Sequence, residues 1–334
     1  MWRFVSHRDY LNATLFWKCL WVIHMRIAIG VITRRRPTGL TRLLASIDAL
    51  HGVRATGDGP LVTQVIIVEN DHASVLQAPL PCRVPIHYAL EQRVGIPCAR
   101  NRVIAEALLL NPRPEWLAFV DDDETVDPHW LQAMGSLAAT TSADVVTGPS
   151  IPMLPPPAPS WALDSGAYNQ PRYPTGTSMP HAYTNNVWTR LSCLVDDKFR
   201  FDERLLQTGG SDTHLYRRLA LHNHAIVWCD EAICHEWYPK TRMTRRWALQ
   251  RSYRIGATNA WIMKEVGEGG RLQCTWQGVR FIARGMLRTA QAVLNGKFSA
   301  ASMTLALDSA RAAGLILGAF GIAQHQEYQV LHGQ

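Results

Sequence analysis

Residues 116–124 read Trp-Leu-Ala-Phe-Val-Asp-Asp-Asp-Glu, an apolar run that ends in four consecutive acids. Unpaired charge is costly to bury, so a buried strand has to end where the acids begin. The stretch therefore predicts a strand that stops at Val120 and a loop that carries all four acids. Ligands of open α/β sheets bind at the carboxyl ends of strands, and clustered carboxylates there suit Mg²⁺. An acidic turn in solvent has the same composition, so the stretch alone leaves both interpretations open.

Length and charge set outer bounds on the fold and its partners. The chain has 334 residues, 47% of them hydrophobic, which is enough for one large or two modest domains. Its net charge of +7 favours an anionic partner, such as a nucleotide, a phosphorylated lipid, a membrane surface or nucleic acid. Its seven cysteines include no C-x-x-C pair, which predicts reduced thiols in a cytosolic protein.

Apolar runs and helical patterns alternate through the first two thirds of the chain. Strands are predicted over 26–33, 65–68, 117–120, 145–147 and 225–229, and helices over 40–50, 93–110, from Asp127 with Pro128 in its first turn, and over 213–222. Charged side chains follow each of the first three strands. This order predicts an α/β fold with a mostly parallel central sheet.

The two ends of the chain differ from this alternating region. Residues 1–24 form an N-terminal extension, for which a translation-start artefact is favoured over an interfacial anchor. Residues 257–334 are expected to form a helical tail, with Arg280, Arg284 and Arg288 in one basic stripe. The apolar run 312–323 is too short to span a bilayer. A tail on a membrane interface and a tail packed on the rest of the chain are both compatible with this pattern.

Five segments between residues 25 and 256 carry a family resemblance as an ordered set. They are Thr33–Pro37, Glu69–Asp71, Arg93–Asn101, Phe119–Glu124 and Phe201–Leu219. Together they resemble the family 2 glycosyltransferases, in particular the bacterial polysaccharide-synthesis branch of succinoglycan-type glucosyltransferases. The resemblance implies a GT-A fold over 25–256, a nucleotide-sugar donor with a UDP-sugar favoured, Mn²⁺ or Mg²⁺, and inversion at the anomeric carbon. It also implies a saccharide or lipid-linked acceptor, and a cytoplasmic location in peripheral contact with the membrane.

The resemblance implies roles for individual side chains. Asp121 and Asp123 match the D-x-D acids that bind the metal and the donor, and Asp212 matches the general base that deprotonates the acceptor. His235, or its neighbour Glu236, is a candidate to complete the metal shell. Further donor contacts are implied for Thr33, Arg34, Glu69, Asp71, Arg100 and Asn101.

The surroundings of these motif residues lead to three further expectations. By alternation, Asp122 should face away from its two neighbours. Gly209 and Gly210 should let the acceptor approach closely, and the helix that follows should keep Asp212 ionised. A plain helix cap is the alternative role for Asp212.

Departures from the family pattern affect the donor and the mode of transfer. Ser211 stands where the family commonly has glutamate, Arg34 where it often has an aromatic residue, and Glu69 where aspartate is usual. Arg34 could keep the role of that aromatic residue, because a guanidinium can also stack on a base. The Gln-x-x-Arg-Trp motif of processive synthases is absent, which favours the addition of one sugar.

Other classes of function use part of the same pattern. A metal-dependent phosphohydrolase acting on a nucleotide or phosphorylated substrate would use the same acids, but would want further His/Asp clusters. A nucleic-acid-binding module would use the arginines of 242–254 and has no need of acids at a strand end, so no nucleic acid is expected as a partner. No G-x-G-x-x-G follows a strand, which disfavours a nicotinamide enzyme.

Overall fold

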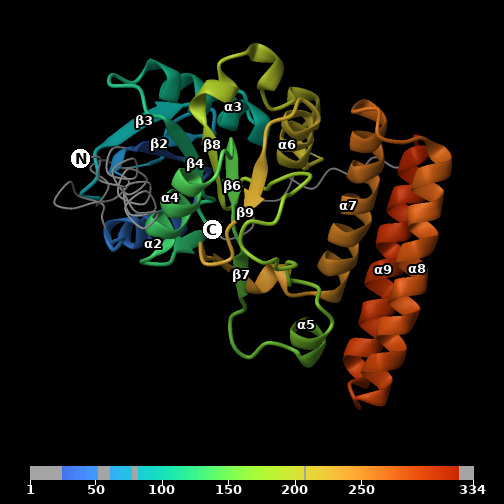
Figure 1. Ribbon diagram of the computed structural model, residues 1–334. Coiled ribbons are helices and arrows are strands. Elements are labelled where there is room, and N and C mark those ends of the chain that lie inside the picture. The colour runs from blue at the N-terminus through green and yellow to red at the C-terminus, as the bar shows by residue number, and fades with distance from the viewer. Residues whose placement is uncertain (1–24, 52–60, 77–81, 207, 323–334) are drawn as a thin grey trace, which may run out of the picture.

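The computed structural model describes residues 25–51, 61–76, 82–206 and 208–322. The predicted N-terminal extension lies outside these residues. The described chain forms a sheet region followed by a group of three long helices (Figure 1).

A seven-stranded sheet, ordered β3-β2-β1-β4-β8-β6-β9, lies at the centre of the first region. Its strands are β1 (Arg26–Thr33), β2 (Leu61–Glu69), β3 (Ile86–Leu90), β4 (Trp116–Phe119), β6 (Val145–Thr147), β8 (Val187–Arg190) and β9 (Ile226–Trp228). β8 runs antiparallel to β4 and β6, and the other neighbouring pairs are parallel. The mostly parallel sheet is therefore confirmed, although β3 and β8 were not predicted.

Helices cover both faces of this sheet, as expected for an α/β fold. They are α2 (Pro37–Asp48) and α4 (Trp130–Thr140) on one face, and α3 (Ile96–Leu109) and α6 (Ser211–Leu221) on the other. α2 buries Leu40, Leu43, Leu44 and Ile47, the spacing that predicted it. The predicted cap at Asp127 was wrong. α4 begins after His129, and the Asp127 carboxylate instead accepts the His129 N–H in the preceding turn.

A second, three-stranded sheet lies beside the acidic loop. It contains β5 (Glu124–Val126), β7 (Ser150–Met153) and β10 (Cys234–Trp237) in the order β5-β10-β7. The prediction that Glu124 belongs to a loop was wrong, because Glu124 begins β5 and pairs with Glu236 of β10. Of the four acids, Asp121, Asp122 and Asp123 lie in the turn between β4 and β5.

The helical region consists of α7 (Arg245–Glu265), α8 (Arg271–Leu294) and α9 (Phe298–Ala319). α9 packs between α7 and α8, and α8 is outermost in Figure 1. Gly314 allows the close approach of α9 to α7, since a Cβ there would lie 1.9 Å from the Tyr253 carbonyl oxygen. The division proposed at residue 256 falls inside α7, so the helical region begins at Arg245.

By its length and composition, α9 could cross a membrane, but half of its apolar stretch is buried inside the protein. The remaining short elements are α5 (Ser160–Asp164) and the 3₁₀ helices η1 (Leu191–Leu194), η2 (Asp197–Phe199), η3 (Glu203–Leu205) and η4 (Lys240–Arg242).

Candidate active site at the carboxyl edge of the sheet

The aspartates of the acidic turn differ in their environments. Asp122 points into the protein, where its carboxylate accepts hydrogen bonds from Thr33 Oγ1 (2.7 Å) and from Arg36 (2.9 Å). Asp123 contacts two guanidinium groups through Oδ2, at 3.2 Å from Arg36 and 3.3 Å from Arg242. The side chain of Asp121 is 35% exposed, with Arg100 3.7 Å away. The turn therefore anchors its middle acid and leaves Asp121 the most accessible.

Burial and the closeness of several acids shift the pKa values of the carboxyls in the acidic turn. Although its side chain is 35% exposed, Asp121 has lost part of its hydration to the surrounding protein, which raises its pKa, and the carboxylates of Asp123 and Asp212 raise that pKa further against the opposing effect of Arg100. Burial also raises the pKa of Asp122 to about 6, although Arg36 opposes this. Burial alone would lower the pKa of Arg36, but the surrounding aspartates outweigh it and raise that pKa. A bound cation would relieve this repulsion.

A second pair of acids lies behind the turn, in the three-stranded sheet. Glu124 is fully buried and accepts hydrogen bonds from Ser150 Oγ (2.6 Å) and from the Asp121 N–H (3.2 Å). Burial and the neighbouring acids raise its pKa well above the usual value. Its ladder partner Glu236 accepts from Tyr238 Oη (2.9 Å), and burial raises the pKa of Glu236 to about 7. These two glutamates extend the acidic cluster away from solvent.

The ladder also distinguishes the two candidates for the third metal ligand. Glu236 lies opposite Glu124, whereas His235 lies opposite Thr125. Successive side chains of a strand point to opposite faces. His235 therefore lies on the face of β10 away from Glu124, and the geometry favours Glu236 as the neighbour of the acids.

The predicted base, Asp212, lies in the first turn of α6. Its Oδ1 accepts the Thr213 N–H at 2.6 Å, and its charge acts on Asp121. Arg100 donates to Ser211 Oγ at 3.2 Å and approaches Asp121 at 3.7 Å, so it connects the two parts of the site. The structure thus brings together Asp121 and Asp212, which are far apart in the sequence.

The backbone and the packing of α7 account for the glycines before Asp212, and the close approach of the acceptor there stays a prediction. Gly209 and Gly210 have φ angles of 74° and 82°, which L side chains rarely adopt. A Cβ at Gly210 would also lie 2.4 Å from Thr258 Cγ2 of α7. The backbone and the packing of α7 therefore require glycine there. Gly210 is itself the residue that precedes α6, so the plain-cap role for Asp212 was wrong.

Glu69 and Asp71, two of the predicted donor-binding residues, are buried and bonded to their own surroundings. The Glu69 carboxylate accepts from Tyr88 Oη (2.5 Å) and from the Val75 N–H (2.9 Å). Asp71 forms an ion pair with Arg35 at 2.5 Å and lies 4.0 Å from Arg34. In this structure both acids hold the loop after β2, and their donor contacts stay predictions.

Two more predicted donor residues also stabilise loops. Asn101 exchanges two hydrogen bonds of 2.9 Å with the backbone of Phe201. Thr33 is bonded to Asp122, as described above. Arg36 and Arg242 were not predicted as site residues, although the arginine run at the end of β1 could have indicated the first. Arg242 could not be inferred, because it reaches Asp123 across 119 positions of sequence.

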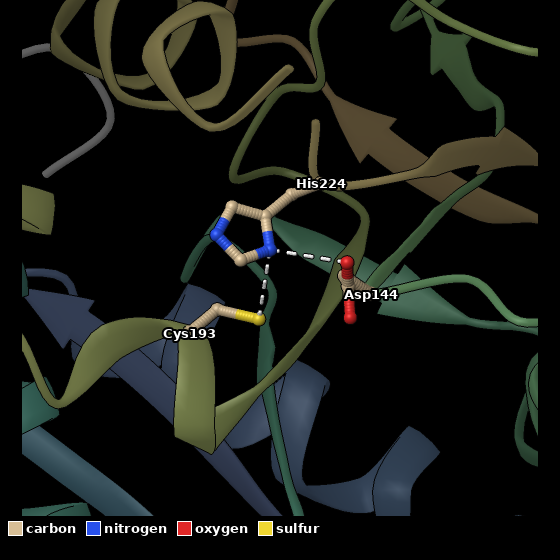
Figure 2. A group of neighbouring side chains, drawn as sticks. All are labelled: Asp144, Cys193 and His224. Atoms are coloured by element: carbon tan, nitrogen blue, oxygen red, sulfur yellow. Dashed lines mark hydrogen bonds and ion pairs between the residues drawn. The ribbon is translucent and has the colours of Figure 1, made fainter. Parts of the chain in front are cut away.

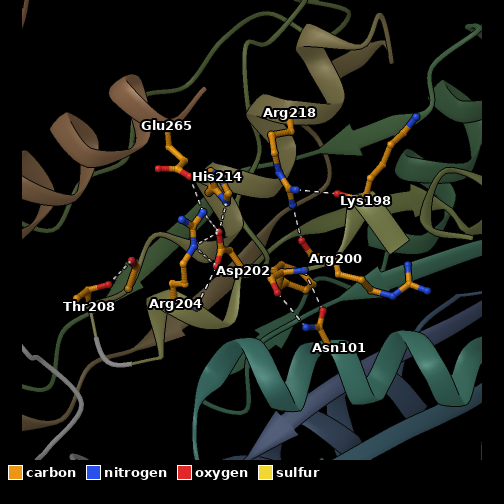
Figure 3. A network of polar contacts seen from close by, with 11 residues as sticks. Asn101, Lys198, Arg200, Asp202, Arg204, Thr208, His214, Arg218 and Glu265 are labelled. Carbon is orange, nitrogen blue, oxygen red and sulfur yellow. Dashed lines mark hydrogen bonds and ion pairs between the residues drawn. The ribbon is translucent and has the colours of Figure 1, made fainter. Parts of the chain in front are cut away.

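A polar network supports the segment between β8 and α6 (Figure 3). Asp202 accepts from the Arg204 N–H (2.9 Å) and guanidinium (2.7 Å), and Arg204 also pairs with Glu265 of α7 at 2.6 Å. His214 of α6 is buried, 3.8 Å from Asp202. The network ties α6 to α7 and so fixes the helix that carries Asp212.

A different group, Asp144, Cys193 and His224, offers three metal-ligand atoms within 4.8 Å of one another (Figure 2). His224 Nδ1 lies 3.0 Å from Asp144 and 3.6 Å from Cys193 Sγ. Asp144 and His224 precede the parallel strands β6 and β9, at the edge of the sheet opposite the acidic turn. Burial raises the pKa of Cys193 to about 11. This group is therefore separate from the predicted metal site.

Comparisons with known proteins place these motifs in context. No protein-family model matches the chain. The succinoglycan biosynthesis protein ExoM of Rhizobium meliloti is 30% identical to it over 311 residues, which cover 91% of this chain and 96% of ExoM. Solved structures of S. aureus TarS residues 1–349, with and without UDP, align over 93% of this chain and 95% of TarS at 15% identity. Their TM-scores are 0.47 and 0.48.

Proposed function

This chain belongs to the family 2-like glycosyltransferases that include ExoM, and we propose that it adds one sugar from a nucleotide-sugar donor to a saccharide during polysaccharide synthesis. The donor we propose is a UDP-sugar, and the acceptor a lipid-linked oligosaccharide at the cytoplasmic face of a membrane. Membership of this family argues against the phosphohydrolase and against a nucleic-acid-binding module.

The observation that carries this proposal is the cluster of carboxylates at the turn after β4, with Asp121 accessible and Asp212 nearby. Asp121 and Asp123 are hard oxygen ligands. Loss of hydration, with the nearby acids Asp123 and Asp212, raises the pKa of Asp121 in spite of Arg100, and a bound cation would favour its charged form. These residues fit Mn²⁺ or Mg²⁺, which Asp121 and Asp123 would hold, with Glu236 nearer to them than His235. When bound, such a cation stabilises the negative charge that develops on a departing diphosphate.

The other side chains of the site support the remaining requirements of transfer. Asp212 would take the proton of the attacking acceptor hydroxyl. Arg100 would hold the acidic turn and the start of α6 at a constant separation. Arg34, which was predicted to contact the nucleotide, is still accessible for that contact. A direct displacement of this kind, assisted by one base, inverts the anomeric carbon.

A thermal-shift experiment on the full chain tests the proposal. UDP-sugars, GDP-sugars and dTDP-sugars are compared in Mn²⁺ and in EDTA, because a ligand that binds only the folded state stabilises it. A UDP-sugar at a hundredfold excess over its Kd should stabilise the protein by about 2.7 kcal/mol, in Mn²⁺ only. Equal stabilisation in EDTA would contradict the metal site. Preference for another nucleotide would show that the donor carries that nucleotide instead of UDP.

A further inference from the structure

The side chains of α8 that point away from α9 are large, apolar and exposed. They are Leu272, Trp276, Val279, Met286, Leu287, Val293 and Leu294. Leu272 and Leu294, near the two ends of the helix, are 88% and 87% exposed. At helical spacing these positions form one stripe, about 36 Å long for a helix of this length.

Within the described part of the chain, this outer face is not the side by which α8 packs on its neighbours. The opposite side of the helix makes that contact through Cys274, Gly278 and Gly285, which are buried. A Cβ at Gly278 would meet Ile316 of α9 at 2.8 Å, so the two helices approach closely. Monomeric soluble proteins rarely expose an apolar stripe of this extent, and such patches mark interaction surfaces.

The charges around the stripe indicate what would cover it. Residues 271–294 contain four arginines and no acid. The Arg280 guanidinium lies 4.7 Å from the centre of the Trp276 ring, at the border of the stripe. A second copy of this chain docked on the same face would bring arginines against arginines. An anionic lipid surface complements both the cations and the apolar side chains.

Two of the arginines in the predicted basic stripe have another role. Arg284 and Arg288 form ion pairs with the buried Asp308 of α9, at 2.6 and 3.3 Å. They therefore hold α8 on α9. Arg280 borders the apolar stripe, and Arg271 lies 5.2 Å from the Phe320 ring at the end of α9.

The apolar composition of α9 has a separate explanation. Gly314 and Gly318 of α9 lie against the backbone of α7, and Ile316 contacts α8. Half of its apolar stretch is buried in this way. The packing of three helices thus accounts for α9, and among the described residues α8 is the member of the three whose apolar face is exposed.

We propose that the protein rests on an anionic membrane through the outer face of α8, with this helix parallel to the bilayer surface. The leucines and Trp276 enter the interface, and Arg271 and Arg280 contact lipid phosphates. The inference deepens the proposed function, on which it rests for the membrane location, by assigning the contact to α8 instead of the arginine stripe or α9. It does not depend on the identity of the donor.

Vesicle co-sedimentation of the full chain tests the assignment, using phosphatidylglycerol mixed with phosphatidylcholine, or phosphatidylcholine alone. The test variant is Leu272→Gln/Leu294→Gln. The matched control is Leu109→Gln/Leu221→Gln, which changes exposed leucines of α3 and α6. Each leucine removed from the interface should weaken partitioning by about tenfold, so the test variant should lose about 10²-fold and the control nothing. Arg280→Gln should cost about fivefold, on the anionic vesicles only.

Three results would overturn the proposal. They are wild-type partitioning of the test variant, equal losses in both double variants, and a shift from dimer to monomer in the test variant without any change in vesicle binding. The last result would show that a second copy covers the face. UDP-sugar binding, measured in parallel by thermal shift, should be the same in all variants. If the wild-type protein showed no specificity for a sugar nucleotide but still bound vesicles, the proposed function would be refuted. The assignment of the membrane contact to α8 would not be affected.

Discussion

Two groups of carboxylates near α6 are compensated in different ways. Asp202 is matched to Arg204, whose guanidinium and backbone N–H hold the pKa of that carboxyl below its usual range. In the acidic turn, burial and neighbouring acids raise the pKa of Asp121 and Asp122. A carboxyl whose pKa is lowered on folding stabilises the fold at neutral pH, and one whose pKa is raised costs stability as pH rises. Asp202 therefore acts as a structural group, whereas the cost of ionising the acidic turn is the property that supports our proposal of a functional site there.

Asp123→Asn should give the largest effect and separates the two groups most clearly. The amide keeps an oxygen for Arg36 and Arg242 but removes a charge that would hold a divalent cation. Transfer per folded molecule should fall by about 10³-fold, because the cation loses a ligand. Near-normal, metal-dependent turnover would exclude Asp123 as a ligand.

The matched control for that variant is Asp202→Asn. It removes the charged partner of Arg204 and should cost about 1.5 kcal/mol of stability. Turnover per folded molecule should fall far less than in Asp123→Asn, because the amide oxygen can still accept the Arg204 N–H and keep the segment before α6 in place. If both substitutions reduced activity equally, the distinction between the two groups would be incorrect.

Asp212→Asn should have the next largest effect, on turnover alone. The amide still accepts the Thr213 N–H but cannot take a proton from the acceptor. We expect kcat to fall by about 10²-fold or more, with donor binding unchanged in a thermal-shift titration. Asp197→Asn, which alters a side chain that is 96% exposed, serves as the control. Loss of donor binding in step with kcat would indicate a structural role for Asp212.

An effect on stability alone, without any change in transfer, is expected in acid from His214, in the network around Asp202. Burial, aided by Arg218, lowers the pKa of His214 to about 4. Between pH 6.5 and 4 the unfolded chain therefore binds more protons at this position, and stability falls as pH falls. The loss should be about 2 kcal/mol at pH 5 and should level off below pH 4. Urea denaturation of His214→Gln should show a shallower decline over this range, whereas the exposed His222→Gln should keep the wild-type slope.

Much of the fold could be predicted because its signals are local. A strand buried on both faces is a continuous apolar run, and β1 and β6 have the predicted bounds. β8 gave no such signal. It has four residues, follows a proline-rich stretch, and enters the sheet antiparallel between β4 and β6. The pairing of β5 with β10 was missed for a related reason, since its partners are more than 100 residues apart.

The sequence alone determined that a strand ends at the acids of 121–123 and that helices alternate with strands, since burial excludes unpaired charge and periodicity selects each element. It also carried the ordered motifs that resemble a glycosyltransferase. Only the tertiary structure decided that Glu124 is buried, that Arg242 reaches Asp123, and that Arg100 connects the acidic turn to α6. It also decided which apolar helix is covered, because α8 and α9 are both apolar and only their packing leaves α8 exposed. These properties depend on contacts between segments that are distant in the sequence, and local sequence patterns do not show which of those segments contact each other.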